Sequence, residues 1–257
     1  MRDGPAVRHL GMYAVVEHDG VADEVAVEEP LEIRVDGQAL AVTMRTPGHD
    51  EELAAGFLYG EGLIKTAPAA IGPADDLAAN VVEVSGPLLR DPGQRRFYTS
   101  SSCGVCGKGA MEEVAVHSSP LPDGPVVERS VLAALPGRLG QPTFDRTGGL
   151  HATGLFDATG EPLISREDVG RHNAMDKVVG RRLLDRCLPL HDQVLCVSGR
   201  LSFELVQKAA VAGSAILVGV GAPSSLAISL ATDRGLTLCG FARRGRLNVY
   251  TRAERVS

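Results

Sequence analysis

The sequence contains no tryptophan, and aromatic residues make up only 4% of its 257 residues. The hydrophobic core must therefore consist mainly of Val, Leu, Ile and Ala, which suits β-sheets covered by alanine-rich helices. The five cysteines are an odd number in a long chain, which argues against the disulfide framework of a small secreted protein. Because Met1 to Asp19 also lacks an apolar run of signal-peptide length, we expect a cytoplasmic protein with reduced thiols.

Long hydrophobic runs and excess positive charge are also missing. The longest apolar run, Ala209 to Ala222, falls short of the roughly 18 residues that a transmembrane helix needs. The formal net charge of −6 argues against nonspecific binding to nucleic acid, although local arginine clusters could still hold one anionic ligand. We therefore expect neither a membrane nor a nucleic acid as partner.

One polar, glycine-rich stretch carries the most reactive chemistry. Residues 100–109 contain the chain's single Cys-x-x-Cys motif, formed by Cys103 and Cys106. Cysteine reacts as its thiolate, which a cation such as Lys108 and the N-terminus of a helix expected over 110–117 would favour. The motif therefore indicates sulfur or redox chemistry. Half of a zinc site, a thioredoxin-like redox pair and two incidental thiols stay open as alternatives.

The remaining cysteines do not complete a zinc site. A closed zinc site needs four Cys or His ligands, and no second Cys-x-x-Cys is present. Cys187, Cys196 and Cys239 stand singly in apolar surroundings and are expected in the core. A zinc deaminase would need His-x-Glu ahead of its cysteines, and no glutamate follows His151 at that spacing. We therefore assign no metal ligands.

The first half of the chain predicts an α+β arrangement. A hairpin is expected over 25–44 with its turn at Asp36-Gly37, and short strands over 81–85 and 95–99. Between the hairpin and these strands, a helix is expected, with Asp50 as its candidate N-cap and His49 as a turn or cap residue. The Pro- and Gly-rich stretch over 118–125 is the best linker. We therefore predict an N-terminal domain over 1–118 and a C-terminal domain over 119–257.

The second half predicts an α/β sheet. A short helix over 130–139, a loop over 140–147 and strands over 148–156 and 161–166 come first. Glu167 and Asp168 are expected to lead an amphipathic helix. Strands over 193–198, 215–220 and 236–242 then alternate with helices over 202–212 and 224–234. This alternation is typical of parallel strands with right-handed crossovers.

The ends of the three predicted parallel strands carry similar chemistry. They are Ser198-Gly199-Arg200, Gly221 to Ser225 and Ala242 to Arg246, and carboxyl ends of parallel strands share one edge of the sheet. Hydroxyls, glycines and arginines before helix N-termini suit a phosphate or pyrophosphate. Neither a Gly-x-Gly-x-x-Gly fingerprint nor a Walker loop is present, which disfavours an ordinary NAD or ATP enzyme. His172 and Asn173 are further candidates, because they could act on a group placed over the cysteine stretch.

Six motifs spread over most of the chain form a specific combination: Ser102-Cys-Gly-Val-Cys-Gly107, Gly149-Leu-His-Ala, Arg166 to Lys177, Ser198 to Glu204, Ala222-Pro-Ser and Gly240-Phe-Ala-Arg. Together they resemble the formate dehydrogenase accessory sulfurtransferases, the FdhD family. The resemblance implies a dimeric sulfur carrier of the cytoplasm whose C-terminal domain is three-layered and cytidine-deaminase-like, with a mixed sheet.

The resemblance also implies a sulfurtransferase activity. Such a protein takes sulfur from a cysteine desulfurase and passes it to the molybdenum or tungsten bis(molybdopterin guanine dinucleotide) cofactor, its bound substrate, before insertion into formate dehydrogenase. By motif, Cys103 would hold the persulfide, and Cys106 could resolve it by exchange. The alternatives are a cofactor-binding chaperone with a metal-clamping or redox Cys-x-x-Cys, and a thiol-disulfide oxidoreductase.

The candidate residues for binding this substrate, or GDP as its partial mimic, come from the strand ends and the motifs: His172, Ser198, Gly199, Arg200, Phe241, Ala242, Arg243, Arg244, Gly245 and Arg246. If the last strand simply continues, its side chains alternate between faces. Arg244 and Arg246 would then share one side and Arg243 the other, so the three arginines could not all face the ligand.

Overall fold

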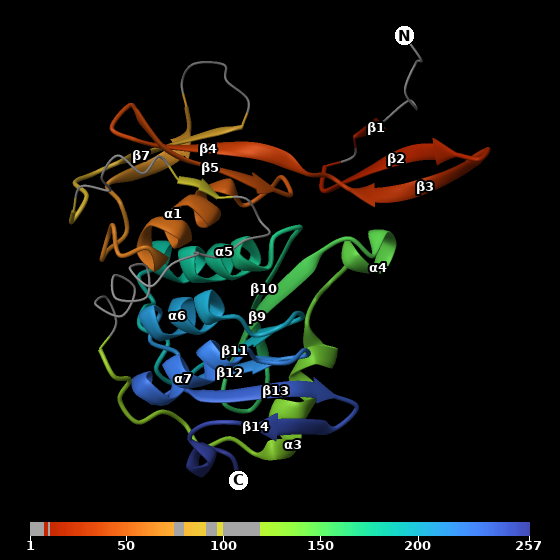
Figure 1. The fold of residues 1–257 in the computed structure, drawn as a ribbon. Coiled ribbons are helices and arrows are strands. Elements are labelled where there is room, and N and C mark those ends of the chain that lie inside the picture. The colour runs from red at the N-terminus through yellow and green to blue at the C-terminus, as the bar shows by residue number, and fades with distance from the viewer. Residues whose placement is uncertain (1–7, 10, 75–79, 91–96, 100–118) are drawn as a thin grey trace.

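The computed structural model describes residues 8–9, 11–74, 80–90, 97–99 and 119–257, which form three β-sheets with helices between and around them (Figure 1). The smallest sheet is an antiparallel arm of β1 (Arg8–His9), β2 (Tyr13–His18) and β3 (Val21–Ala26) that extends away from the body of the molecule. The arm is held by Arg146, which donates a hydrogen bond to Glu24 and lies 4.0 Å from the centre of the Tyr13 ring.

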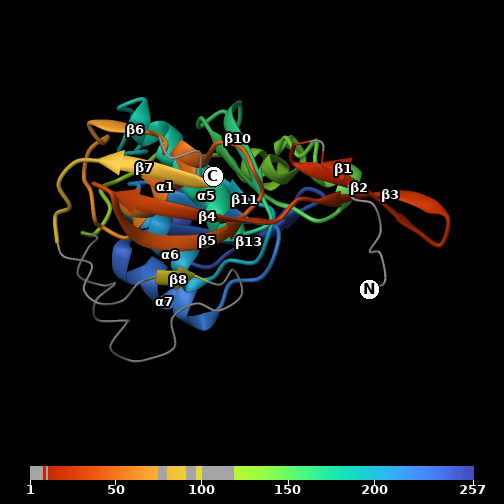
Figure 2. The ribbon, with the colours of Figure 1, turned by 90° about the horizontal axis from the view of Figure 1, so that it is seen from above.

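The second sheet has five strands in the order β6-β7-β4-β5-β8. Their bounds are β4 (Glu29–Val35), β5 (Gln38–Arg45), β6 (Ala70–Pro73), β7 (Val81–Ser85) and β8 (Phe97–Thr99). Strands β4 and β5 form the predicted hairpin, and both turn residues, Asp36 and Gly37, have positive φ. Strand β8 runs parallel to β5 at the edge of the sheet and pairs Thr99 with Thr43 (Figure 2).

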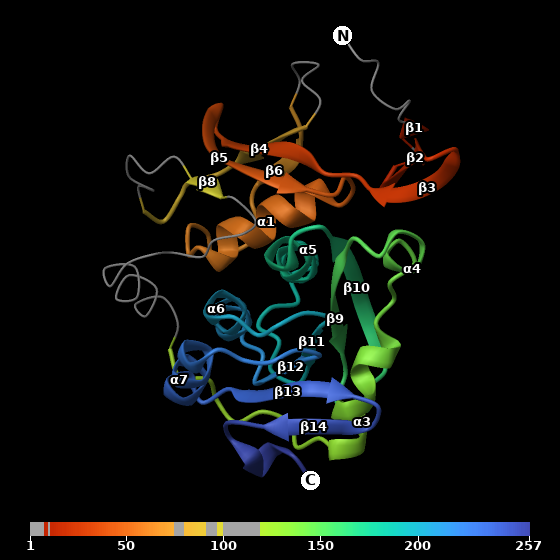
Figure 3. The ribbon, with the colours of Figure 1, turned by 45° about the vertical axis from the view of Figure 1, so that its right-hand side comes forward.

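The two halves of the chain meet where helix α1 (Asp50–Gly60) packs on helix α5 (Arg171–Leu184) (Figure 3). Two glycines make this approach very close. A Cβ added at Gly56 would lie 1.9 Å from the carbonyl oxygen of Asp176, and one added at Gly180 would lie 1.8 Å from that of Glu52. A larger side chain at either position would force the helices apart.

The third sheet is mixed and has six strands in the order β10-β9-β11-β12-β13-β14, with β11, β12 and β13 parallel. The strands are β9 (His151–Phe156), β10 (Pro162–Asp168), β11 (Val194–Val197), β12 (Ile216–Gly219), β13 (Thr237–Arg243) and β14 (Arg246–Val249). The helices are α3 (Arg129–Ala134), the 3-10 helix η1 (Leu135–Arg138), α4 (Phe144–Thr147), α6 (Phe203–Val211), α7 (Ser225–Arg234) and the 3-10 helix η2 (Ala253–Arg255).

Helices cover both faces of this sheet (Figure 3). Leu195, Leu217 and Leu238 point into a core with α5, α6 and α7, whereas Cys196 and Val218 pack on the opposite side with α3 and η1. Consecutive strand residues thus fill different cores, as the two-residue period of a strand requires. The predicted α/β class, with a three-layered mixed sheet in the C-terminal half, is confirmed.

Four local predictions were wrong. Glu167 and Asp168 end strand β10 instead of leading a helix, because both carboxylates are buried and used in hydrogen bonds. Residues 140–147 are not only loop, since they contain α4. Asp50 is the first residue of α1 and pairs with Arg45, and His49, with φ 60°, is the N-cap. Cys187 is exposed, not in the core.

Residues 119–126 contain no helix or strand, which agrees with the linker expected there. The division into domains over 1–118 and 119–257 stays a prediction. In the part of the chain that the structure describes, no helix has the length and apolar character to cross a membrane.

Candidate functional site

The three parallel strands end side by side at one edge of the six-stranded sheet. The N–H of Gly221 donates to the carbonyl of Gly199 at 3.0 Å, and the N–H of Phe241 donates to the carbonyl of Gly221 at 3.1 Å. These bonds join the exits of β11, β12 and β13 into one backbone surface. The hydroxyl of Ser198 accepts a bond from the N–H of Ala152 at 2.9 Å, which ties β9 to the same edge.

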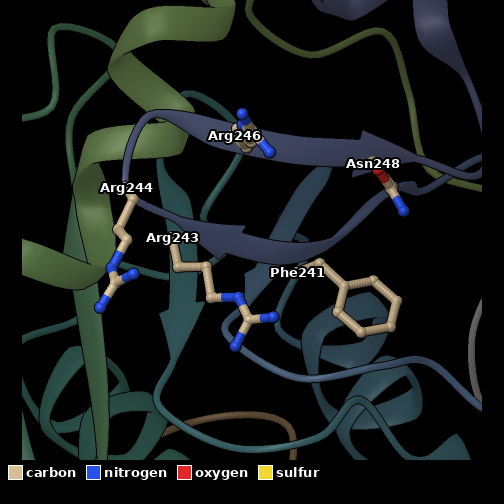
Figure 4. A pocket seen from close by; sticks show the side chains of 5 residues that line it. All are labelled: Phe241, Arg243, Arg244, Arg246 and Asn248. Atoms are coloured by element: carbon tan, nitrogen blue, oxygen red, sulfur yellow. The ribbon is translucent and has the colours of Figure 1, made fainter.

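The β13–β14 hairpin lines a pocket of about 780 Å³ at this edge. We call it the arginine pocket, and it is lined by Phe241, Arg243, Arg244, Arg246 and Asn248. Figure 4 shows Phe241, Arg243 and Arg244 extending on the same side of the hairpin. The three arginines are exposed, and none forms an ion pair with another described residue. Unpaired guanidiniums beside an aromatic ring suit an anion that carries a planar group.

The hairpin overturns the expected division of the arginines between two faces. Strand β13 ends at Arg243, and Arg244 (φ 51°) and Gly245 (φ 75°) form a two-residue turn into β14. Arg243 therefore pairs directly with Arg246, and opposite residues of an antiparallel pair share a face. Alternation along one continuous strand does not apply because the chain reverses, and all three arginines line the pocket.

The backbone is strained where the pocket begins. Phe241 has a φ of 55°, which is rare for a bulky residue, and the pairing of β13 with β14 shifts between Gly240 and Arg243. Phe241 is also 38% exposed. Such strain persists only where the surrounding structure imposes it, and it is common at binding sites. The side chain of Ala242, by contrast, lies in the core.

His172 is in the first turn of α5, where it faces the start of α6, and it does not line the arginine pocket. Its Nε2 atom is 3.3 Å from the hydroxyl of Ser202 and 3.8 Å from a carboxylate oxygen of Glu204. Burial, with the positive charges of Lys208 and Arg171, lowers the pKa of His172 to about 4. The imidazole is therefore neutral at pH 7, so that it binds as a hydrogen-bonding group and not as a cation.

His151 belongs to the strand exits, and sequence reasoning did not select it. An added Cβ at Gly199 would lie 3.4 Å from Nδ1 of His151. Burial, and then the charges of Arg171 and Arg200, lower the pKa of His151. The sequence places His151 only at the beginning of a strand. The antiparallel pairing of β9 with β11 is what brings it to the carboxyl edge.

A buried carboxylate fixes the first turn of α5. Asp168 is fully buried, forms a 2.7 Å ion pair with Lys177, and accepts bonds from the N–H of Gly170 and the amide of Asn173. The same amide donates to the carbonyl of Met44 on β5 at 2.8 Å. Asn173 thus joins α5 to the N-terminal sheet.

Cys103 and Cys106 lie outside the described residues, as does the helix expected over 110–117. Cys196 and Cys239 are buried, as expected, and burial raises the pKa of both thiols, that of Cys239 to about 12. Neither is a nucleophile at neutral pH. Within the described ranges, no group of three or more His, Cys, Asp or Glu side chains could hold a metal ion.

Known proteins resemble this chain along nearly its whole length. The model of the FdhD/NarQ family matches residues 26–257. The sulfur carrier protein FdhD of Nocardia farcinica is 51% identical over 246 residues, which cover 91% of this chain and 88% of that protein. The protein of the same name from Mycobacterium tuberculosis is 46% identical over 270 residues, covering 98% and 97%.

A solved structure agrees with the fold. The crystal structure of a protein assigned as a formate dehydrogenase accessory protein, from Desulfotalea psychrophila, superimposes with a TM-score of 0.75 at 28% identity, and the match covers 98% of this chain and 99% of that one. Sequence and fold therefore agree along the whole molecule, and this chain belongs to the FdhD/NarQ family.

Proposed function

We propose that this protein is a sulfurtransferase that accepts sulfur on Cys103 from a cysteine desulfurase and transfers it to the molybdenum bis(molybdopterin guanine dinucleotide) cofactor of formate dehydrogenase. The cofactor is the substrate of this reaction. Relatives named sulfur carrier proteins, and a similar structure assigned as a formate dehydrogenase accessory protein, support the carrier role.

The structural observation that carries the choice of substrate is the arginine pocket. Guanidiniums bind phosphate oxygens through charge-assisted, often bidentate hydrogen bonds. A guanine ring could stack on the exposed ring of Phe241. A volume of about 780 Å³ lies within the roughly 300–1,000 Å³ of small-molecule sites. The pocket would therefore hold the guanine dinucleotide end of the substrate, and GDP should bind there as a partial mimic.

Loading of Cys103 needs no added oxidant or reductant. The Cys103 thiolate attacks the terminal sulfur of the desulfurase persulfide, the bond between that sulfur and the desulfurase cysteine breaks, and the desulfurase thiolate leaves. Cys103 then carries the persulfide. Attack of Cys106 on the Cys103 sulfur would form a disulfide and release hydrosulfide, after which an external thiol must reduce the disulfide.

The described chain ahead of Cys103 ends beside the first turn of α5. Thr99, four residues before Cys103 in the sequence, pairs with Thr43 of β5, and the hydroxyl of Thr43 donates to Asn173 at 3.4 Å. Arg171 belongs to the same turn. We propose a role for α5 in sulfur transfer, because Arg171 would favour the thiolate of a thiol brought beside it.

Mass spectrometry of the intact protein tests the carrier role. After incubation with a cysteine desulfurase and cysteine, the wild-type protein should gain the mass of one sulfur atom, which a thiol reductant removes. Cys103→Ala should gain none and should fail to activate formate dehydrogenase, whereas Cys106→Ala should be affected less. Cys187→Ala is the matched control because Cys187 is exposed and lies outside the motif. Labile sulfur on Cys103→Ala would contradict the proposal.

The second candidate function is a cofactor-binding chaperone whose Cys-x-x-Cys clamps a metal or exchanges disulfides. The arginine pocket favours it as much as it favours the carrier, because both must bind the guanine dinucleotide. A chaperone of this kind would copurify with metal and would acquire no labile sulfur. The mass experiment therefore separates the two.

We also propose, from the family, that the protein acts as a homodimer in the cytoplasm. Light scattering at several protein concentrations measures the assembly directly. A monomer mass at all concentrations would contradict the dimer.

A further inference from the structure

A second cavity, of about 420 Å³, opens at the same edge of the six-stranded sheet. Its walls come from η1, the α4 region, the start of β9 and the ends of β11 and β12, and we call it the β9 cavity. The residues that matter here are Leu139, Gln141, Phe144, His151 and Ser198. No Asp, Glu, Lys or Arg side chain among the described residues lines the β9 cavity, which distinguishes it from the arginine pocket.

A buried carboxylate holds one wall of the β9 cavity in place. Glu167 is 6% exposed and accepts hydrogen bonds from the backbone N–H groups of Phe144 at 2.7 Å and Thr143 at 3.1 Å. These bonds fix the start of α4, where Phe144 is 38% exposed. Burying a carboxylate is costly unless it is hydrogen-bonded. Phe144 therefore offers a positioned aromatic face on which a planar ligand could stack.

The polar groups of the β9 cavity provide both donors and acceptors. The side-chain amide of Gln141 and the imidazole of His151 make no hydrogen bond within the described part of the chain. The hydroxyl oxygen of Ser198 accepts a hydrogen bond from the N–H of Ala152, and the hydroxyl hydrogen stays available to a ligand. With its pKa lowered by burial and by nearby arginines, His151 is neutral at pH 7 and offers one donor and one acceptor. These groups match a neutral ring with mixed polar edges.

We propose that the β9 cavity binds the 2-amino-4-oxopyrimidine ring that pterins and guanine share. Phe144 stacks on this ring, and Gln141, His151 and Ser198 bind its amine, amide and carbonyl groups. The inference deepens the proposed function and rests on it, because the proposed substrate contains both ring systems. Arg200, whose charge acts on His151, would attract the phosphate tail of such a ligand.

Fluorescence titration with free pterin tests the proposal. The wild-type protein should bind pterin saturably, and Phe144→Ala should weaken binding about 5- to 150-fold through the lost stacking. Gln141→Leu keeps the side-chain volume but removes the amide, and should weaken binding about 2- to 12-fold. Leu163→Ala is the matched control, because Leu163 is a 45% exposed apolar side chain of β10 that does not line the β9 cavity.

Guanosine and GDP distinguish the source of the ring and the two sites. Pterin and guanosine are titrated separately against the wild-type protein and Phe144→Ala. The compound that binds more tightly, and whose binding Phe144→Ala weakens, identifies the ring system that the β9 cavity prefers. Either result supports the proposal. GDP held in the arginine pocket should leave pterin binding unchanged. Arg243→Ala should weaken the binding of GDP but not the binding of pterin. Competition between GDP and pterin that Arg243→Ala relieves would assign the ring to the arginine pocket and overturn the proposal.

Two further outcomes would also overturn it: no saturable binding of either ring up to about 1 mM, or binding that Phe144→Ala leaves unchanged. Persulfide loading of Cys103, measured on the same samples, keeps this inference separate from the carrier role. Loading without ring binding overturns only the assignment of the β9 cavity. Ring binding without loading overturns only the carrier role.

Discussion

The α1–α5 interface and the β13–β14 hairpin both contain several cationic side chains, which are paired with carboxylates at the interface and, among the described residues, unpaired in the hairpin. At the interface, the buried cations Lys177 and Lys208 and the half-buried Arg166 have carboxylate partners: Asp168, Asp176 and Glu52, respectively. In the hairpin, the three arginines of the arginine pocket are exposed and have no ion-pair partner within the described ranges.

The difference separates charges that hold the fold from charges that are available to a ligand. An unpaired charge in the interior costs several kcal/mol, so the interface tolerates cations only as pairs. An exposed arginine stays hydrated when it is unpaired, and several together create a positive potential that attracts anions. Variants of the interface should therefore lose stability, and variants of the hairpin should lose binding.

The largest effect is expected for Lys177→Met. It keeps an unbranched apolar stem but leaves the fully buried carboxylate of Asp168 without its counter-charge. We expect the free energy of unfolding to fall by about 3–5 kcal/mol. Urea denaturation measures this loss, and Lys65→Met, at an exposed position, is the control. A loss below about 1 kcal/mol would contradict the prediction, because it would show that the Lys177–Asp168 pair contributes no more than an ordinary surface ion pair.

Glu52 should make the stability of the interface depend on pH. Burial opposes its charge, but His49 at 3.6 Å and the hydrogen bonds from Arg166 prevail and lower its pKa to about 2, from an ordinary value of 4.5. The stability from such a carboxylate is present above its unfolded pKa and is lost as the pH falls toward its folded pKa. Glu52→Gln should lower the free energy of unfolding by about 2–3 kcal/mol at pH 7. The difference in this free energy between the variant and the wild type should shrink as the pH falls from about 5 to about 2.

Urea denaturation at a series of pH values tests the role of Glu52. The control is Glu51→Gln, because Glu51 is in the same helical turn and forms no ion pair with the described residues. A Glu52→Gln difference that stays constant from pH 5 to pH 2 would be inconsistent with the lowered pKa.

Arg243→Ala and Arg246→Ala test the other region. Each charge-assisted contact contributes roughly 1.5–3 kcal/mol, so each variant should bind GDP about 10- to 100-fold more weakly, with an unchanged melting temperature. Because the two residues are paired across the hairpin, both should be affected. Calorimetric titration measures the affinity, and exposed Arg186→Ala is the control. Weaker binding by Arg186→Ala would indicate only a general effect of charge.

The smallest effect is expected for Arg146→Ala. Its ion pair with Glu24 is exposed at the arm, where solvent screens the attraction. We expect almost no change in melting temperature, although amide hydrogen exchange in β2 and β3 should become faster. A large drop in melting temperature would show that the arm is part of the cooperative core.

The strands and helices after residue 190 could be predicted because local pattern specifies them. Short apolar strands alternate with amphipathic helices there, and the periods of two and 3.6 residues do not depend on distant contacts. The sequence wrongly predicts Glu167 and Asp168 as helix residues, because acidic residues are common at helix starts. Only the folded chain supplies the buried N–H groups and Lys177 that hold these carboxylates in a strand.

For the candidate site, the order of residues along the chain specifies which groups are available: arginines, glycines and hydroxyls at three strand ends that share an edge. How these groups meet depends on the folded chain. The turn at Arg244 and Gly245 brings Arg243 opposite Arg246, and antiparallel pairing of β9 brings His151 to the edge. The reason is physical, since strand period is set by neighbours in the chain, whereas pairing register and buried charge depend on residues far away in sequence.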